Sequence, residues 1–141
     1  MIMKRAICLI LITALAAVIL TACGENETID TNVKFSVYES NGSDMISFYS
    51  TSETEISGKW EYSLDNNQIL KVFHDTESEK NFGSFFEKKT ASYRTIILQP
   101  VAEGEAFISF NTSKGESEYS FKLTVTKDKN DILRIKSENL E

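Results

Sequence analysis

The stretch YSFKLTVT at residues 119–126 decides the fold class of this chain. Every second position in it is apolar, and Ser, Lys or Thr fills the positions between. Successive side chains of a strand point to opposite faces, so this alternation predicts a strand with one buried and one solvated face. Antiparallel sheets are commonly covered on one face only, and we therefore predict an antiparallel sheet.

The same period of two recurs on the N-terminal side of this stretch. β-Branched and aromatic residues dominate these segments, and no window keeps a helical period. Turn-forming residues separate them, for example Ser40-Asn41-Gly42-Ser43 and Glu103-Gly104. The predicted strands are residues 33–38, 45–50, 59–64, 69–74, 93–101, 106–110, 119–126 and 132–136.

About seven to eight short strands with frequent turns are typical of an antiparallel β-sandwich. Between them we expect polar loops at residues 51–58 and 111–118, and a long irregular segment at residues 75–91. In such a sandwich the loops after the second, fourth and sixth strands gather at one end. The first strand should start at that same end.

The N-terminus has the zones of a secretory signal. Lys4 and Arg5 precede the uncharged residues 6–20, a run of about 15 residues that is shorter than the roughly 20 a membrane-spanning helix needs. An uncleaved membrane anchor is the alternative. The next residues, Leu20-Thr21-Ala22-Cys23, resemble the lipobox of bacterial lipoproteins.

The lipobox resemblance implies cleavage before Cys23 and a diacylglyceryl group on its thiol. Two or three acyl chains anchor a protein stably, because each buried methylene contributes roughly 0.8 kcal/mol. We therefore expect a signal peptide at residues 1–22, a lipidated tether at residues 23–32 and one β-sandwich domain at residues 33–141. The expected location is the extracytoplasmic side of the cell membrane.

The mature chain would be one acidic domain without a free thiol. Cys8 would leave with the signal and Cys23 would carry lipid, so no disulfide is expected. Losing Lys4 and Arg5 leaves 13 basic residues against 21 acidic ones, a formal net charge of −8. An acidic surface disfavours binding to nucleic acid or to anionic lipid.

Residues that carry catalysis are sparse in the mature chain. Its single histidine, His74, ends a predicted strand beside Asp75. No serine lies in a Gly-x-Ser-x-Gly motif, and the paired glutamates fall in predicted loops without the spacing of a calcium loop. We therefore predict no catalytic residue, no metal site and no cofactor, and we do not expect an enzyme.

A further sequence feature is a set of four segments at residues 57–62, 64–72, 97–110 and 119–126. Together they resemble the chagasin-like family of cysteine-protease inhibitors. They correspond to that family's Trp-containing strand, the following turn and strand, the central hairpin and the penultimate strand. This resemblance implies an immunoglobulin-like sandwich that inhibits papain-like proteases through three loops. The first loop lacks the family's Asn-Pro-Thr-Thr-Gly motif, and the third lacks its Arg-Pro-Trp motif.

The candidate protein-binding residues lie in these three loops. For Trp60 the alternative is a core anchor, and for the three phenylalanines it is a loop packed back on the sandwich. The candidates are Gly58, Lys59, Trp60, Phe82, Gly83, Ser84, Phe85, Phe86, Ser113, Lys114 and Gly115.

The sequence thus predicts a membrane-anchored lipoprotein whose β-sandwich binds a protein, with a cysteine protease as the partner that the resemblance implies. The alternative is a non-inhibitory immunoglobulin-like module with a structural or adhesive role in an envelope assembly. Inhibition needs a compact wedge of loops, whereas an assembly module can use a sheet face or edge.

Lipidation is directly testable. Replacing Cys23 with Ala should leave an uncleaved precursor that takes up no fatty-acid label, because the acceptor thiol is gone. Metabolic labelling followed by electrophoresis measures both effects. Normal cleavage and labelling of the Cys23→Ala chain would contradict the prediction.

Overall fold

The computed structural model describes residue 29 and residues 31–83, 86–114 and 118–140. These residues form eight β-strands and one short helix. The elements in chain order are β1 (Asn32–Ser40), β2 (Ser43–Glu53), α2 (Thr54–Ser57), β3 (Trp60–Leu64), β4 (Leu70–Gly83), β5 (Lys88–Pro100), β6 (Gly104–Thr112), β7 (Glu118–Lys127) and β8 (Leu133–Asn139).

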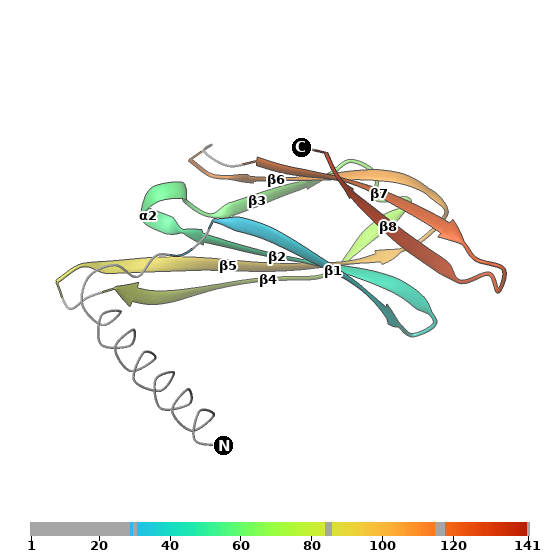
Figure 1. Cartoon of the computed structure of the whole chain (residues 1–141), viewed down its shortest axis with the longest axis horizontal. Coiled ribbons are helices and arrows are strands. Elements are labelled where there is room, and N and C mark those ends of the chain that lie inside the picture. Colours follow the sequence, from blue (N-terminus) through green and yellow to red (C-terminus); the bar gives the residue numbers. More distant parts are fainter. Residues whose placement is uncertain (1–28, 30, 84–85, 115–117, 141) are drawn as a thin grey trace, which may run out of the picture.

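The strands form two four-stranded sheets that pack face to face (Figure 1). The first sheet has the order β1-β2-β5-β4 and the second the order β3-β6-β7-β8. All neighbouring strands are antiparallel. The predicted all-β, two-sheet architecture is confirmed.

β7 has the two faces that its alternation predicted. Phe121, Leu123 and Val125 point between the sheets and are at most 2 % exposed. Lys122 and Thr124 are partly exposed on the opposite side. The pattern therefore identified the core-facing residues of this strand.

Three phenylalanine rings join the two sheets at the centre of the core. Phe48 comes from β2, whereas Phe110 and Phe121 come from β6 and β7. The Phe48 ring centroid lies 5.1 Å from that of Phe110 and 5.2 Å from that of Phe121. Aromatic pairs at such distances contribute about 0.5–1.5 kcal/mol beyond the area they bury. Aliphatic residues surround them, chiefly Ile46, Ile96, Leu98, Ile108, Leu123 and Val125.

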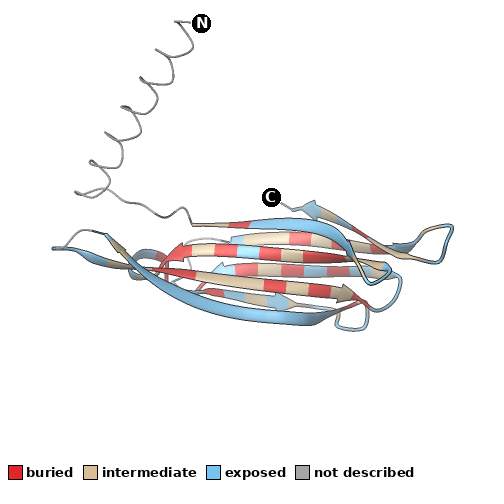
Figure 2. Cartoon of the chain, turned by 90° about the horizontal axis from the view of Figure 1, so that it is seen from below, coloured by how far each residue is buried: buried red, intermediate tan, exposed pale blue. Residues whose placement is uncertain are grey.

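The irregular segment predicted at residues 75–91 is wrong. β4 continues to Gly83, β5 begins at Lys88, and the two pair as a long hairpin with a bulge between Val72 and His74. β4 is an edge strand that is exposed over most of its length (Figure 2). Hydrophobic alternation reports burial, and a strand with two solvated faces has no such pattern.

Other predicted strands are also too short, although several of their polar end residues are buried: Ser52, Glu53 and Thr112 are at most 5 % exposed. β2 runs to Glu53 and is followed by α2, where the sequence predicted a loop. β6 extends to Thr112, and β8 continues to Asn139. Polar residues form these strand ends, so the apolar pattern stops before the hydrogen-bonded ladder does.

Arg134 of β8 ties the second sheet to the first. Its guanidinium lies 3.1 Å from carboxylate oxygens of Glu39 and Asp44, and 3.0 Å from Asp128. Asp44 also accepts the backbone N–H of Ile135 at 3.0 Å. This cluster fixes the position of β8 against the β1–β2 hairpin.

The aromatic core predicts a large difference between two phenylalanines of the second sheet. Phe121→Ala should lower the free energy of unfolding of residues 24–141 by about 3–5 kcal/mol, because it leaves a cavity among packed rings. Phe107 is 40 % exposed on the outer face, and Phe107→Ala should cost about 1 kcal/mol or less. Urea unfolding followed by circular dichroism measures both. Equal losses would contradict the proposed core.

Candidate functional site

Three chain connections lie together at one end of the sandwich, which we call the loop end. They are the β2–β3 connection with α2, the β4–β5 hairpin turn and the β6–β7 connection (Figure 1, left). β1 begins at this end too, since the Thr31 hydroxyl lies 3.4 Å from that of Ser57. The chain therefore enters the domain beside the loops.

The first and third connections are interlocked around Gly58. Ser113 donates its N–H to the Lys59 carbonyl at 2.8 Å, and its hydroxyl accepts the Lys59 N–H at 3.0 Å. The Lys114 N–H reaches the Ser57 carbonyl at 3.2 Å. Gly58 has φ +76°, and a Cβ there would overlap the Ser113 hydroxyl. Only glycine fits this close approach.

α2 is also bound to β5, which starts the second arm of the hairpin. The Glu55 carboxylate accepts the Thr90 backbone N–H at 2.8 Å. This bond lowers the pKa of Glu55 below its ordinary value, so the carboxylate is charged at neutral pH. The Lys114 ammonium group donates a hydrogen bond to the Glu55 backbone carbonyl at 2.6 Å. α2 thus links the β6–β7 connection to the hairpin.

Trp60 is the first residue of β3 and anchors the loop end to the core. Its side chain is 2 % exposed, its indole N–H donates to the Thr51 carbonyl at 2.6 Å, and its ring meets Tyr119 edge-on at 5.7 Å. The sequence left Trp60 as either a partner-binding residue or a core anchor, and these contacts are those of a core anchor. A partner would therefore touch the loops that Trp60 positions.

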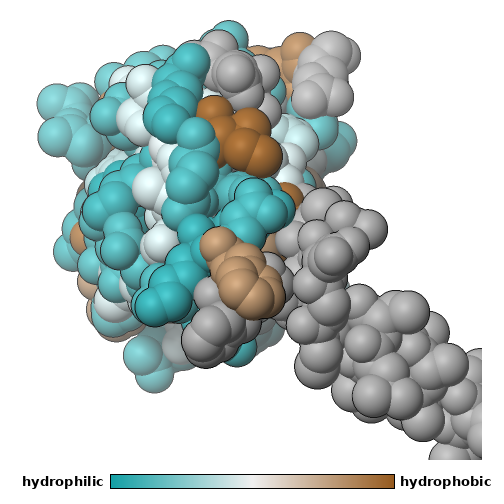
Figure 3. Space-filling model, turned by 90° about the vertical axis from the view of Figure 1, so that its left-hand side faces the viewer, coloured by the Kyte–Doolittle hydropathy of each residue, from teal (hydrophilic) through white to brown (hydrophobic). Residues whose placement is uncertain are grey.

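Two large apolar side chains project from the described part of the loop end. Phe86, after the hairpin turn, is 95 % exposed, and Ile56 of α2 is 55 % exposed. Apolar surface stands out as brown patches among teal in Figure 3. Ile56 is not among the predicted protein-binding residues. The sequence feature that could have indicated it is a single branched apolar residue within a polar segment.

The other candidates have varied surroundings. Phe82 is half-buried at the end of β4, and Gly83 has φ +100° with its Cβ position against the Glu87 carbonyl. Lys59 pairs with Glu79 at 2.8 Å. Ser84, Phe85 and Gly115 lie outside the described residues, as do the predicted signal peptide and Cys23.

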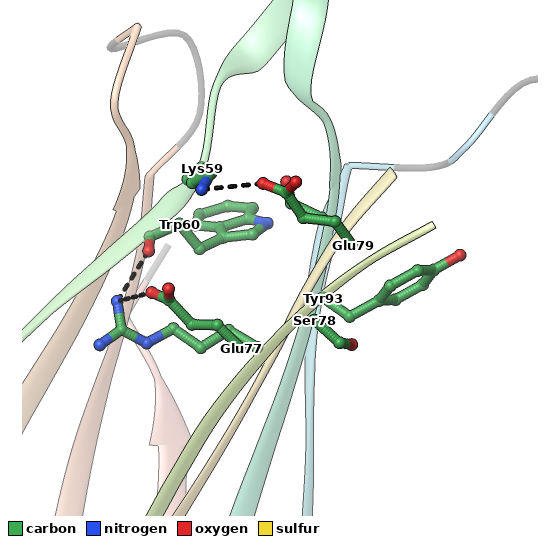
Figure 4. A pocket seen from close by; sticks show the side chains of 8 residues that line it. Lys59, Trp60, Glu77, Ser78, Glu79 and Tyr93 are labelled. Carbon is green, nitrogen blue, oxygen red and sulfur yellow. Dashed lines mark hydrogen bonds and ion pairs between the residues drawn. The ribbon is translucent and has the colours of Figure 1, made fainter. Parts of the chain in front are cut away.

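A small pocket opens beside the loop end, between β3 and the β4–β5 hairpin (Figure 4). Lys59 and Glu79 bridge its mouth, while Arg94 bonds to Asp75, at 2.9 and 3.0 Å, and to the Trp60 carbonyl at 2.9 Å. The Asp75 hydrogen bond is the main cause that raises the pKa of Arg94. The cavity measures about 20 Å³, room for about one water molecule. The charged side chains around this cavity form a seam that closes this edge of the sandwich.

Three further features concern the described residues. They hold no group of three or more His, Cys, Asp or Glu side chains arranged to bind a metal ion. None of their helices has the length and apolar composition needed to cross a membrane. His74 lies on the exposed edge strand β4.

Comparison with known proteins adds no relative. No protein-family model matches the chain, and neither the curated proteins nor the solved structures include a significant match.

Gly58 provides a test of the interlocked loops. Gly58→Ala should lower the free energy of unfolding by about 1–3 kcal/mol, because it combines a strained φ with an overlap at Ser113. Gly42 also has a positive φ of +81°, but nothing lies within 4 Å of its Cβ position. Gly42→Ala is therefore the matched control and should cost less. Urea unfolding measures both, and equal costs would show that the Gly58–Ser113 contact is unimportant.

Proposed function

We propose that the mature chain is a lipid-anchored extracytoplasmic binding protein whose loop end contacts a protein partner. The observation that carries this proposal is the interlocking of residues 55–59 with residues 113–114 and with Thr90. These contacts join the first and third connections to each other and to the start of β5. Ile56 projects from α2, and Phe86 lies two residues before β5.

A unit of this kind suits the binding of a concave surface. Its hydrogen bonds are formed within the chain, so little conformational entropy is lost when a partner binds. Exposed large apolar side chains on a rigid support are the common anchors of protein interfaces. Lys59 and Lys114 are held by neighbours, which leaves the apolar projections as the main anchors.

The proposed partner is a papain-like cysteine protease, the class implied by the resemblance to chagasin-like inhibitors. The strand order β1-β2-β5-β4 opposite β3-β6-β7 corresponds to the ABED and CFG sheets of immunoglobulin constant-type domains, with β8 added. This order supports an immunoglobulin-like assignment. We propose binding rather than catalysis, since the described residues of the loop end offer contact surface rather than an acid–base pair.

The second candidate is a structural or adhesive module of an envelope assembly. The long exposed strand β4 favours it, because a free sheet edge can pair with a strand of another chain. The two candidates use different surfaces, and mutations can therefore separate them.

The inhibitor proposal is tested by titrating residues 24–141 against a papain-like protease and following peptide hydrolysis. Ile56→Ser combined with Phe86→Ser should weaken inhibition by a few kcal/mol, about a hundredfold or more, if both are interface anchors. Both side chains are mostly exposed, so the fold should persist.

Phe107→Ser is the matched control, because Phe107 is an exposed ring on the outer face of the second sheet. It should leave inhibition unchanged. An absence of inhibition by the unmodified domain at about 10 µM, a weak affinity by protein-interface standards, would reject the inhibitor proposal and favour the assembly module. Inhibition retained by the double variant would move the contact away from Ile56 and Phe86.

A further inference from the structure

The outer face of the first sheet is basic, although the mature chain is acidic overall. Its side chains are those out of phase with Phe48 and Leu98, which point into the core. The register puts Lys34 opposite Tyr49 and Lys71 opposite Gln99 on this face. The remaining lysines are Lys80, opposite Ala91, and Lys89, opposite Phe82. We call these four lysines and the surface between them the basic face.

Carboxylates are almost absent from the basic face. Among the described strand residues that point to it, Glu53 is the one acid; it is 5 % exposed and lies 3.7 Å from Lys89. None of the ion pairs among the described residues involves Lys34, Lys71 or Lys80. Three exposed ammonium groups are therefore available to an external anion.

The second sheet presents a different outer face. Glutamates alternate there with serine, threonine and lysine, and Lys122 is paired with Glu105 at 3.2 Å. The fold thus separates charge that the sequence spreads along the chain. The glutamates of that face are Glu61, Glu105, Glu118 and Glu138.

Hydroxyl groups fill the basic face between the lysines. Tyr49 and Tyr93 stack on each other across β2 and β5, with ring centroids 6.1 Å apart. In Figure 4 the Tyr93 ring lies on the opposite side of β5 from Trp60. Rings with a polar tip suit a boundary between water and apolar material. The neighbouring hydroxyl residues are Ser36, Ser47, Thr51, Thr76, Ser78 and Thr95.

We infer that the basic face lies against a bilayer that contains anionic lipid. This inference rests on the proposed lipid anchor. β1 is an edge strand of the first sheet, and eight residues separate Cys23 from it. A flexible linker of that length has a root-mean-square reach of about 14–17 Å. The anchor therefore keeps this sheet within reach of the membrane surface.

The overall acidity of the chain does not prevent this contact. The Debye length at physiological salt is about 8 Å, and packed sheets are about 10 Å apart. The glutamates on the far side of the second sheet are therefore largely screened from the lipid. Asp75 and Glu79, on the inner side of β4, are paired with Arg94 and Lys59.

The docked orientation places the long axis of the sandwich along the membrane. The loop end then points sideways rather than away from the bilayer. A partner that binds the loop end would approach along the membrane surface. This orientation refines the proposed function because it restricts partners to membrane-bound or membrane-adjacent proteins.

The test uses the full chain purified from membranes and reconstituted into vesicles of phosphatidylcholine, alone or mixed with phosphatidylglycerol. A fluorophore is attached at Ser78→Cys on the basic face or at Ser63→Cys on the outer face of the second sheet. Both positions are exposed and lie on edge strands. A quencher on the lipid headgroups should quench the Ser78→Cys fluorophore selectively, and only in vesicles with phosphatidylglycerol.

Charge reversal supplies the matched controls. Each lysine near an anionic surface raises the population of the docked state about fivefold. Lys34→Glu with Lys71→Glu should therefore lower the ratio of docked to undocked chains by at least about 25-fold. Lys122→Glu with Lys136→Glu on the second sheet makes the same change in net charge and should leave quenching unchanged.

Flotation with the vesicles tests the lipid anchor independently of docking by the basic face. A chain that floats with both kinds of vesicle but is quenched equally at both positions overturns the docked face and supports the anchor. A chain that floats only with anionic vesicles, quenched at Ser78→Cys, overturns the anchor and supports the face. No flotation overturns both. Self-quenching between Ser78→Cys fluorophores, independent of phosphatidylglycerol, would show that a second copy covers the face and would overturn the inference.

Discussion

The packing of Phe48 against Phe110 and Phe121 holds the two sheets against each other. It joins the centres of two sheets that share no strand. The predicted mature chain has no disulfide, so apolar packing between the sheets must supply most of the stability. Arg134 then aligns β8 with the β1–β2 hairpin, and Arg94 closes the opposite seam through Asp75 and the Trp60 carbonyl. Both edges of the sandwich are therefore set by charged groups and its centre by aromatic rings.

The arrangement of the loop end depends on this packing. Trp60 is held in the core, which fixes the start of β3 and brings Gly58 against Ser113. That close approach allows three backbone-directed hydrogen bonds between the first and third connections. α2 carries the order on to β5 through Glu55. A partner would therefore meet a surface whose shape is determined by the core rather than by the loops alone.

The separation of charge between the two outer faces has the same origin. Charged residues are excluded from the aromatic core. Because side chains alternate between the two faces of a strand, each charged residue lies on an outer face or at a seam. On the first sheet these positions hold lysines and hydroxyl residues, and on the second they hold four glutamates together with Lys122 and Lys136. A chain with a net negative charge can thereby present one basic surface. Net charge alone disfavoured an anionic partner, and the distribution of charge on the folded sheets reverses that argument for one face.

The sequence predicted the fold class and the core-facing residues of the strands that are buried on one side, such as Phe121, Leu123 and Val125, because burial imposes a period of two. It also determined which segments begin and end near the loop end. The conformation of solvated segments depends on tertiary contacts that the local pattern does not show. Residues 75–83 and 88–91 are strand rather than loop, because pairing with a neighbour needs backbone groups and no apolar side chain. The exposure of Ile56, the burial of Trp60 and the grouping of Lys34, Lys71 and Lys80 on one face depend on contacts between residues far apart in the chain. A local pattern cannot report such contacts, since they exist only after the two sheets have packed.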